Sequence, residues 1–165
     1  MEATERNTIK GEANISDCGK YRYWLSRAWD ESKNIGAFIC INPSKATSLM
    51  SDLTLSNCNN LAVQWGWGGF YIINLFAYRA TDPNELKSQP EWIRVGPVNN
   101  KVISHVADIA DQIILAWGND YKKRSTEVLK LLDGKPLYCI EKNKGGGYLH
   151  PSRIKTENYL RPKPV

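Results

Sequence analysis

Short runs of apolar residues alternate along this chain with segments in which apolar residues recur at helical spacing. Apolar runs at residues 35–41, 70–74, 112–117 and 137–140 have the length and composition of buried strands. Residues 21–29 are aromatic and are interpreted as a strand that leads into a turn, although their periodicity is ambiguous. The pattern predicts a sheet whose central strands are covered on both faces.

The segments between the strands carry helical patterns. In residues 54–65, Leu55, Cys58, Leu61, Ala62 and Trp65 fall at helical spacing, and Asp52 or Ser51 lies near the start of the helix. Further helices are expected at 99–110 and 121–132, and a loop at 81–84. Alternating strands and helices are typical of an α/β fold with three α/β/α layers and a mostly parallel central sheet. Without an internal repeat or a linker, residues 1–165 are expected to form a single domain.

Composition limits the classes of protein that fit. The chain has 165 residues, of which 42% are hydrophobic, and it contains no apolar run of the roughly 20 residues that span a bilayer. Its polar start lacks the apolar stretch of a signal peptide, so a soluble cytoplasmic protein without membrane contact is expected. Cys18, Cys40, Cys58 and Cys139 are scattered and are interpreted as reduced thiols, with Cys40 and Cys139 inside strands. We therefore expect no metal site and no cofactor.

The net charge of +5 and the pI near 9.0 point weakly toward a polyanionic partner, although many soluble proteins are mildly basic. The distribution of charge strengthens the argument, because much of the positive charge lies in the last third of the chain. The residues are Lys122, Lys123, Arg124, Lys142, Lys144, Arg153, Lys155, Arg161 and Lys163.

Polar or turn-forming residues follow the predicted strands. Asn42-Pro43-Ser44 follows the first central strand, Asn74 ends the second, and Trp117-Gly118 ends the third. His150-Pro151-Ser152 comes after the last. In open α/β sheets, ligands bind outside the carboxyl ends of the strands, so a site is expected where these segments meet.

The same ordered segments resemble the uracil-DNA glycosylase superfamily over about residues 35–154. Ile41-Asn42-Pro43 is similar to the first motif of the mismatch-specific and thymine-DNA branches, which carry Asn where the uracil-specific branch carries Asp. Residues 71–74 resemble the strand that ends in the base-reading Asn, and residues 114–118 a later strand that ends in Trp-Gly. His150-Pro151-Ser152 matches the second active-site motif. The chain also resembles a small uncharacterised family with the same Asn-Pro-Ser and His-Pro arrangement, which implies no activity.

The resemblance implies two catalytic residues, and the sequence near the first loop offers a third candidate. Asn42 would orient the attacking water, and His150 would donate a hydrogen bond to the base oxygen on which negative charge develops. A carboxamide is no general base, so Asp52, the nearest carboxylate to the first loop, is the candidate for that role. The alternatives are a turn cap for Asn42, a loop histidine bonded to backbone for His150, and a helix cap for Asp52.

The resemblance also implies residues that bind the base and the DNA. Asn74 would read the polar edge of the flipped base, or cap the next segment instead. Trp117, at a strand end, is a further base-binding candidate, as is Ser44. The candidates for DNA contact are Pro43, Ser44, Lys45, Ser152, Arg153 and Ile154, with Ile154 suited to wedge into the base stack and Arg153 to bind a phosphate.

The expected function is therefore that of a monofunctional DNA glycosylase, which hydrolyses the N-glycosidic bond of a flipped modified or mismatched pyrimidine. Ser44 stands where the uracil-specific branch carries a Tyr that closes the C5 side of the base, so a C5-modified base would fit. Glucosylated hydroxymethylcytosine of phage DNA, and hence antiphage defence, is one possibility. The alternatives are a non-catalytic nucleotide or DNA sensor and a hydrolase of free nucleosides or nucleotides. No obligate protein partner is expected.

Overall fold

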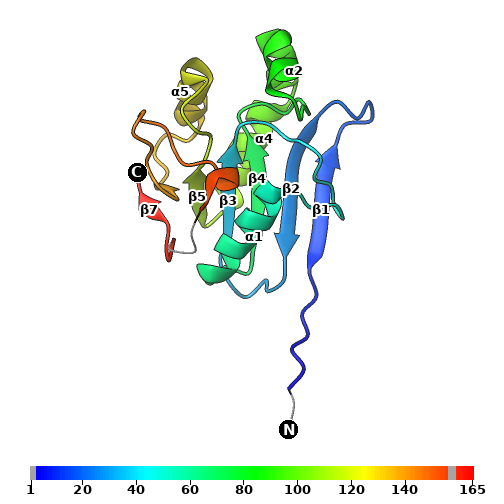
Figure 1. The fold of residues 1–165 in the computed structure, drawn as a ribbon, viewed down its shortest axis with the longest axis vertical. Helices are drawn as coiled ribbons and strands as arrows, with labels where there is room; N and C mark the ends of the chain where they lie inside the picture. The colour runs from blue at the N-terminus through cyan, green and yellow to red at the C-terminus, as the bar shows by residue number, and fades with distance from the viewer. Residues whose placement is uncertain (1–2, 156–158) are drawn as a thin grey trace.

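A single mixed sheet forms the centre of the molecule. The computed structural model describes residues 3–155 and 159–165, and in this part of the chain seven strands pair in the order β1-β2-β4-β3-β5-β6-β7 (Figure 1). The strands are β1 (Lys10–Ile15), β2 (Arg22–Ala28), β3 (Ile35–Cys40), β4 (Gly69–Asn74), β5 (Gln112–Leu115), β6 (Leu137–Cys139) and β7 (Lys163–Pro164).

The central strands are parallel and the outer strands are not. β3 pairs in parallel with β4 on one side and β5 on the other, and β6 continues the parallel pairing beyond β5. On the β4 side, β2 and β1 pair antiparallel, and at the opposite edge β7 runs antiparallel to β6. The sheet is therefore mixed, and the expectation of a mostly parallel sheet is correct only for its centre. The strands of the parallel centre are the ones that read as continuous apolar runs.

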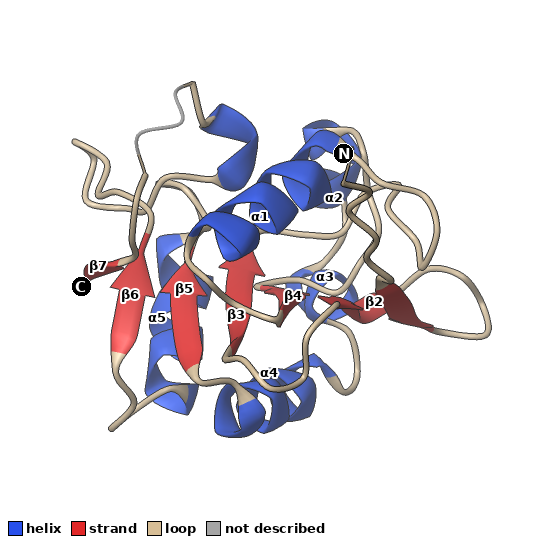
Figure 2. Ribbon diagram, turned by 90° about the horizontal axis from the view of Figure 1, so that it is seen from below, coloured by secondary structure: helices blue, strands red, loops and turns tan. Residues whose placement is uncertain are grey.

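Helices cover both faces of this sheet, which makes the fold α/β (Figure 2). The residues of α1 that are buried belong to the core on one face, whereas those of α4 and α5 belong to the core on the other face. The helices are α1 (Leu53–Gln64), α2 (Pro83–Ser88), α3 (Glu91–Val95), α4 (Asn99–Ile109), α5 (Lys122–Leu131) and the short 3₁₀ turn η1 (Pro151–Arg153).

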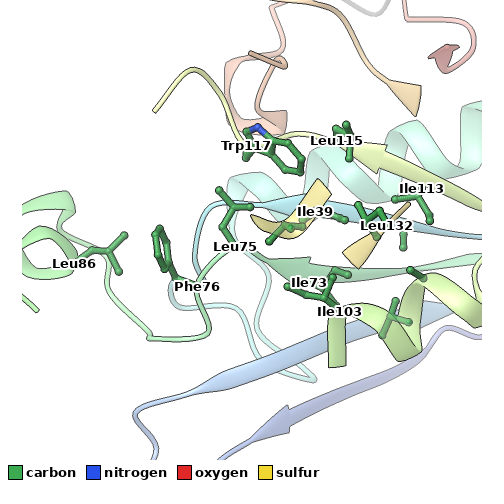
Figure 3. Close-up of a cluster of buried hydrophobic side chains, with 14 of the residues drawn as sticks. Ile39, Ile73, Leu75, Phe76, Leu86, Ile103, Ile113, Leu115, Trp117 and Leu132 are labelled. Atoms are coloured by element: carbon green, nitrogen blue, oxygen red, sulfur yellow. The ribbon is translucent and has the colours of Figure 1, made fainter. Parts of the chain in front are cut away.

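Along each parallel strand, successive side chains point alternately into the two cores. Ile39, Ile73 and Leu115 face α4 and α5, in the cluster that Figure 3 shows. Phe38 and Ile72 face α1. Successive side chains of a strand point to opposite faces, so each central strand serves both cores.

The predicted elements agree with the structure to within a residue or two at their ends. The helices expected at 54–65, 99–110 and 121–132 are confirmed as α1, α4 and α5. The loop expected at 81–84 was wrong, because α2 begins at Pro83, with the Asp82 side chain accepting a hydrogen bond from the Asn84 backbone N–H. The sequence pattern also missed β1, whose residues are exposed or half-buried and therefore carry no apolar run.

Candidate functional site

The loops that follow the parallel strands meet at one edge of the sheet. The connection after β3 runs through α1 to β4, whereas the connection after β5 runs through α5 to β6 on the opposite side. This divergence makes the gap between the carboxyl ends of β3 and β5 a topological switch point, where ligands of α/β proteins bind. η1 also reaches this region, because it packs beside α1 (Figure 1).

Asn42 joins the loop after β3 to the loop after β4. Its Nδ2 donates hydrogen bonds to the carbonyl oxygens of Pro43, at 3.1 Å, and Ala80, at 2.8 Å. The Ala80 N–H in turn donates to the Pro43 carbonyl at 3.0 Å. Within the described residues no group donates to the Asn42 Oδ1, so this oxygen is the part of the side chain that is left to bind a water or a ligand.

The rest of the loop after β3 is held by arginine side chains. Arg22 Nη1 donates to the carbonyl of Ala46 at 2.8 Å, and Arg27 Nη2 donates to that of Thr47 at 3.1 Å. Both arginines come from β2, which lies two strands away from β3 in the sheet. The loop is therefore fixed to the sheet at two consecutive carbonyl groups.

Arg22 is a buried charge without an ion-pair partner among the described residues. It is 3% exposed, and its Nε donor has no hydrogen-bond partner. Burial lowers the pKa of Arg22 to about 10, and the charge of Asp52 acts in the opposite direction. The guanidinium therefore stays protonated at neutral pH. Sequence analysis missed this residue, because a lone Arg in an aromatic strand gives no local sign of burial.

Asn74 lies fully buried at the end of β4. It is 1% exposed, pairs in register with Cys40 of β3, and shares its face of β4 with Ile72, which belongs to the α1 core. Its backbone carbonyl accepts a hydrogen bond from Asn99 Nδ2, but its own side-chain Nδ2 has no partner. A buried donor without an acceptor costs about 1–3 kcal/mol. A bound ligand or an ordered water would supply the missing acceptor.

His150 caps η1 with its imidazole. Nδ1 accepts a hydrogen bond from the Ser152 backbone N–H at 3.2 Å and lies 2.8 Å from the Ser152 Oγ. Because a neutral imidazole that accepts at Nδ1 carries its proton on Nε2, this contact fixes His150 as an Nε2 donor. Asn57 of α1 anchors the same turn by donating to the Pro151 carbonyl at 2.7 Å.

Two buried thiols, Cys40 at the end of β3 and Cys58 on α1, lie in contact near His150. Contact with the Cys58 thiol, assisted by His150 and by the charge of Arg22, lowers the pKa of Cys40 to about 6. Burial raises the pKa of Cys58. Cys40 is 1% exposed, so its interaction with His150 places the imidazole against the same strand end that holds Asn74.

Two of the expected site residues, Asp52 and Trp117, make contacts that stabilise the fold. Asp52 caps α1, because its Oδ1 accepts a hydrogen bond from the Leu55 N–H at 2.8 Å, as the capping alternative expected, and its role as a general base stays a prediction. Trp117, labelled in Figure 3, is 3% exposed and packs edge-on against Tyr148, so its ring is not presented at the surface, and its role in binding the base stays a prediction. Trp117 belongs to the core on the α4 and α5 face, opposite to Asn74.

The expected DNA-binding residues also divide into exposed and covered ones. Lys45 and Arg153 are exposed, and Ser44 and Ser152 are half-buried. Pro43 is buried, and Ile154 is half-buried against the α1 core, so neither is presented as a free contact. The Oγ of Ser44 lies 3.2 Å from the Oγ1 of Thr81, which links the loops after β3 and β4 a second time.

The basic residues of the last third do not form one patch. Arg124 is buried and donates to the Leu75 carbonyl and to Asn100, and Lys123 pairs with Glu91 at 3.0 Å. Lys163 pairs with Glu141. The exposed cations that remain near the sheet edge lie on the loops after β3 and β6 and on η1. They are Lys45, Lys142, Lys144 and Arg153.

Other features of the structure lie away from this edge. A cavity of about 710 Å³ is lined by residues of α3, α4 and α5 and by Tyr21, and it contains none of Asn42, Asn74 and His150. Within residues 3–155 and 159–165, no group of three or more His, Cys, Asp and Glu side chains is placed to hold a metal ion. None of the helices described is long and apolar enough to cross a membrane.

Comparison with known proteins gives one match. The sequence profile of a family described as "Protein of unknown function (DUF1643)" matches residues 22–152, from Arg22 at the start of β2 to Ser152 in η1. No curated protein and no solved structure matches the chain.

Proposed function

Because the chain belongs to the DUF1643 family, whose description names no activity, we propose from the site itself that the protein is a DNA glycosylase for a modified or mismatched pyrimidine. The supporting observation is that Asn74 and His150 flank the same strand end. Asn74 offers a buried Nδ2 donor without a partner, and the His150 imidazole interacts with Cys40, the register partner of Asn74. A planar ring with carbonyl oxygens is a ligand that accepts from both donors.

In the proposed reaction, the bond between C1′ of the sugar and the ring nitrogen of the base breaks, and the base leaves with the electron pair. The oxygen of the attacking water forms the new bond to C1′, and the proton that the water loses is taken up by the departed base. Negative charge then develops on the base oxygens. The Nε2–H of His150 stabilises this charge after it exchanges its contact with the Cys40 thiol for one with the base, while the Ser152 N–H keeps Nδ1 as an acceptor. The amide of Asn74 binds the polar edge of the same base.

Asn42 acts on the other reactant. Its Nδ2 is committed to two carbonyl groups, so its Oδ1 has a fixed direction and accepts a hydrogen bond from the attacking water. A carboxamide does not take a proton at neutral pH, and Asp52 is engaged as a helix cap. The proposed chemistry therefore depends on a good leaving base rather than on deprotonation of the water.

The substrate class follows from the small side chain of Ser44 and from the burial of Asn74. A serine at this position leaves room for a substituent on C5 of the pyrimidine. Asn74 is 1% exposed, so the base reaches it only when covering side chains move, and a base that is weakly stacked or mispaired enters at the lowest cost. A bulky C5-modified cytosine, such as a glucosylated hydroxymethylcytosine, fits the first condition, and its removal from phage DNA would serve defence.

The test is incubation of the purified protein with duplex and single-stranded DNA that carries normal, deaminated, mismatched and C5-modified pyrimidines, followed by alkaline cleavage of abasic sites. Strand breaks at one base type that are lost in His150→Ala and Asn74→Ala, and retained in His105→Ala, support the proposal. His105 lies on α4, away from this edge, and is the matched histidine control. Absence of breaks with every DNA in the panel contradicts it.

A non-catalytic DNA or nucleotide sensor is the second candidate, and the position of Asp52 favours it. With this carboxylate used as the cap of α1, the site has no evident general base. The sensor predicts binding of the same modified DNA, measured by fluorescence anisotropy, that is weakened in Asn74→Ala without any abasic product. Abasic product from the wild-type protein excludes it.

A further inference from the structure

We propose that Lys20, Arg22 and Arg79 form a binding site for one phosphate group of the DNA strand that carries the target base. The proposal rests on the proposed function and names the place where the DNA backbone is held. The three cations come from two paired segments, the start of β2 with the residues before it and the loop after β4. Because β2 runs antiparallel to β4, its first residues lie at the end of the sheet where β3 and β4 finish (Figure 1).

The pairing of these segments puts the three cations on one face. Tyr21 and Tyr78 form an antiparallel bridge, and their rings meet edge to face. Tyr21 also stacks on Tyr23, as residues two apart in an extended segment do. Each of the three cations adjoins Tyr21 or Tyr78 in the sequence, so its side chain points to the opposite face. On that face Arg22 reaches the loop after β3.

Both arginines leave the same edge of the guanidinium unused. Arg22 Nη1 donates to the Ala46 carbonyl at 2.8 Å, and Arg79 Nη1 donates to the Gly19 carbonyl at 3.1 Å. In both side chains Nε is buried and has no acceptor. Within the part of the chain that the structure describes, neither Nη2 donates to a protein group. The Nε and Nη2 donors of one guanidinium form a fork that matches two oxygens of a phosphate.

The charges of these side chains are not balanced by ion pairs. Among the described residues, no ion pair includes Lys20, Arg22 or Arg79. Burial is the main cause that lowers the pKa of Arg22, and the charge of Arg79 acts in the same direction, whereas that of Asp52 opposes it. A buried guanidinium beside a second one is costly without a counterion, so a bound anion would stabilise this face.

The cationic face adjoins the candidate site. Ala80, which follows Arg79 in the chain, accepts a hydrogen bond from Asn42 Nδ2 at 2.8 Å. A phosphate bound at Arg79 is therefore next to the side chain proposed to orient the attacking water, and phosphate contacts of this kind fix the register of a nucleic acid in a site. Lys20 is exposed and Arg79 is half-buried, so these two contact the phosphate, and the buried Arg22 adds its charge.

The experiment counts phosphate contacts separately from base excision. Binding of a fluorescein-labelled single strand is followed by anisotropy over a range of NaCl concentrations. Arg79→Gln is expected to bind about tenfold more weakly and to lower the slope of log K against log [NaCl] by about 0.7, the value for one lost phosphate contact of a single strand. Arg79→Lys keeps the charge but not the fork, so it should keep the slope and lose part of the affinity. Lys130→Gln is the matched control, because it removes an exposed charge near the end of α5.

A second arm uses inorganic phosphate alone. Phosphate is expected to raise the Tm of the wild type relative to chloride at equal ionic strength, and to raise that of Arg79→Gln less. This result with an unchanged DNA slope assigns the site to a free phosphate or nucleotide and overturns the assignment to DNA. An unchanged slope without stabilisation by phosphate overturns the site, as does an equal loss in Lys130→Gln.

The outcomes also separate this site from the proposed function. A slope lowered in Arg79→Gln, without abasic product from the wild type on any DNA, supports the phosphate site and rejects the glycosylase. Abasic product from the wild type with an unchanged slope in Arg79→Gln rejects the phosphate site and leaves the glycosylase standing.

Discussion

Two buried asparagines in this structure are expected to respond to the same substitution with opposite signs. Asn74 and Asn99 are each 1% exposed. The Nδ2 of Asn74 has no acceptor, whereas the Nδ2 of Asn99 donates to the carbonyls of Asn74, at 3.0 Å, and Leu75, at 3.1 Å. Leucine keeps the branching of the asparagine side chain and removes its polar atoms. We predict that Asn74→Leu stabilises the protein and that Asn99→Leu destabilises it.

The magnitudes follow from the hydrogen bonds. Removal of an unsatisfied buried donor relieves about 1–3 kcal/mol, which raises the free energy of unfolding of Asn74→Leu by that amount. Asn99→Leu removes two hydrogen bonds and leaves the Asn74 carbonyl without its donor, which lowers the free energy of unfolding by about 1–3 kcal/mol. Part of this loss is offset, because the substitution also removes the buried Asn99 Oδ1, which has no partner. The Leu75 carbonyl keeps its bond from Arg124 Nε, at 2.9 Å, which limits this loss. For a chain of this size, each kcal/mol moves Tm by about 2–4 °C.

The assay is urea denaturation of the wild type and the variants, followed by circular dichroism, together with the glycosylase or DNA-binding measurement on the same preparations. Methyl groups are larger than the amide atoms that they replace, so Asn74→Val is included as a smaller apolar variant. The Asn74 variants are expected to gain stability and to lose activity or binding, which is the signature of a polar group kept for its ligand.

A loss of more than about 1 kcal/mol in both Asn74→Leu and Asn74→Val would refute the reasoning, because it would mean that the amide has a stabilising partner such as a buried water. A gain of stability in Asn99→Leu would also refute the reasoning. Full activity in a stabilised Asn74 variant would leave the energetic argument intact and remove Asn74 from the site.

Three further outcomes are expected. Asp52→Ala removes the cap that binds the Leu55 N–H, so it should lower the free energy of unfolding by about 1 kcal/mol in a urea titration. The rate of base excision should change little. A large loss of rate at unchanged stability would instead support a catalytic role for Asp52. The pKa of Cys40 is about 6 in the folded state and near 9.0 unfolded, so the unfolded state binds more protons between these values. The free energy of unfolding should therefore rise with pH through this window, relative to Cys40→Ala, and this contribution should be lost as pH falls through about 6; a parallel pH profile of the two proteins would contradict it. A Cβ at Gly147 would lie 1.9 Å from the Gly118 carbonyl oxygen, so Gly147→Ala should cost about 1–3 kcal/mol in thermal unfolding, and wild-type stability would show that the loop after β6 shifts freely.

The local pattern of the sequence determined the central strands of the fold and the helices that cover them. β3, β4, β5 and β6 could be predicted because a strand that is buried on both faces has to be apolar throughout, and α1 because its apolar residues repeat at helical spacing. The sequence also determined that Asn42, Asn74 and His150 come after such strands. Parallel strands end at a common edge, so these residues were expected to gather there, and Asn74 and His150 do meet at Cys40.

Tertiary structure alone decided what each polar or apolar side chain does at that edge. Arg22 is buried and holds a loop, and Trp117 belongs to a core, because of contacts with residues far away in the sequence. Leu49 is exposed and Ile154 is half-buried against the α1 core, although both are apolar residues outside the strands and helices. Periodicity reports only the average environment of a segment. The burial and hydrogen bonding of a single atom depend on which distant segments pack against it, and the chain fixes those only when it folds.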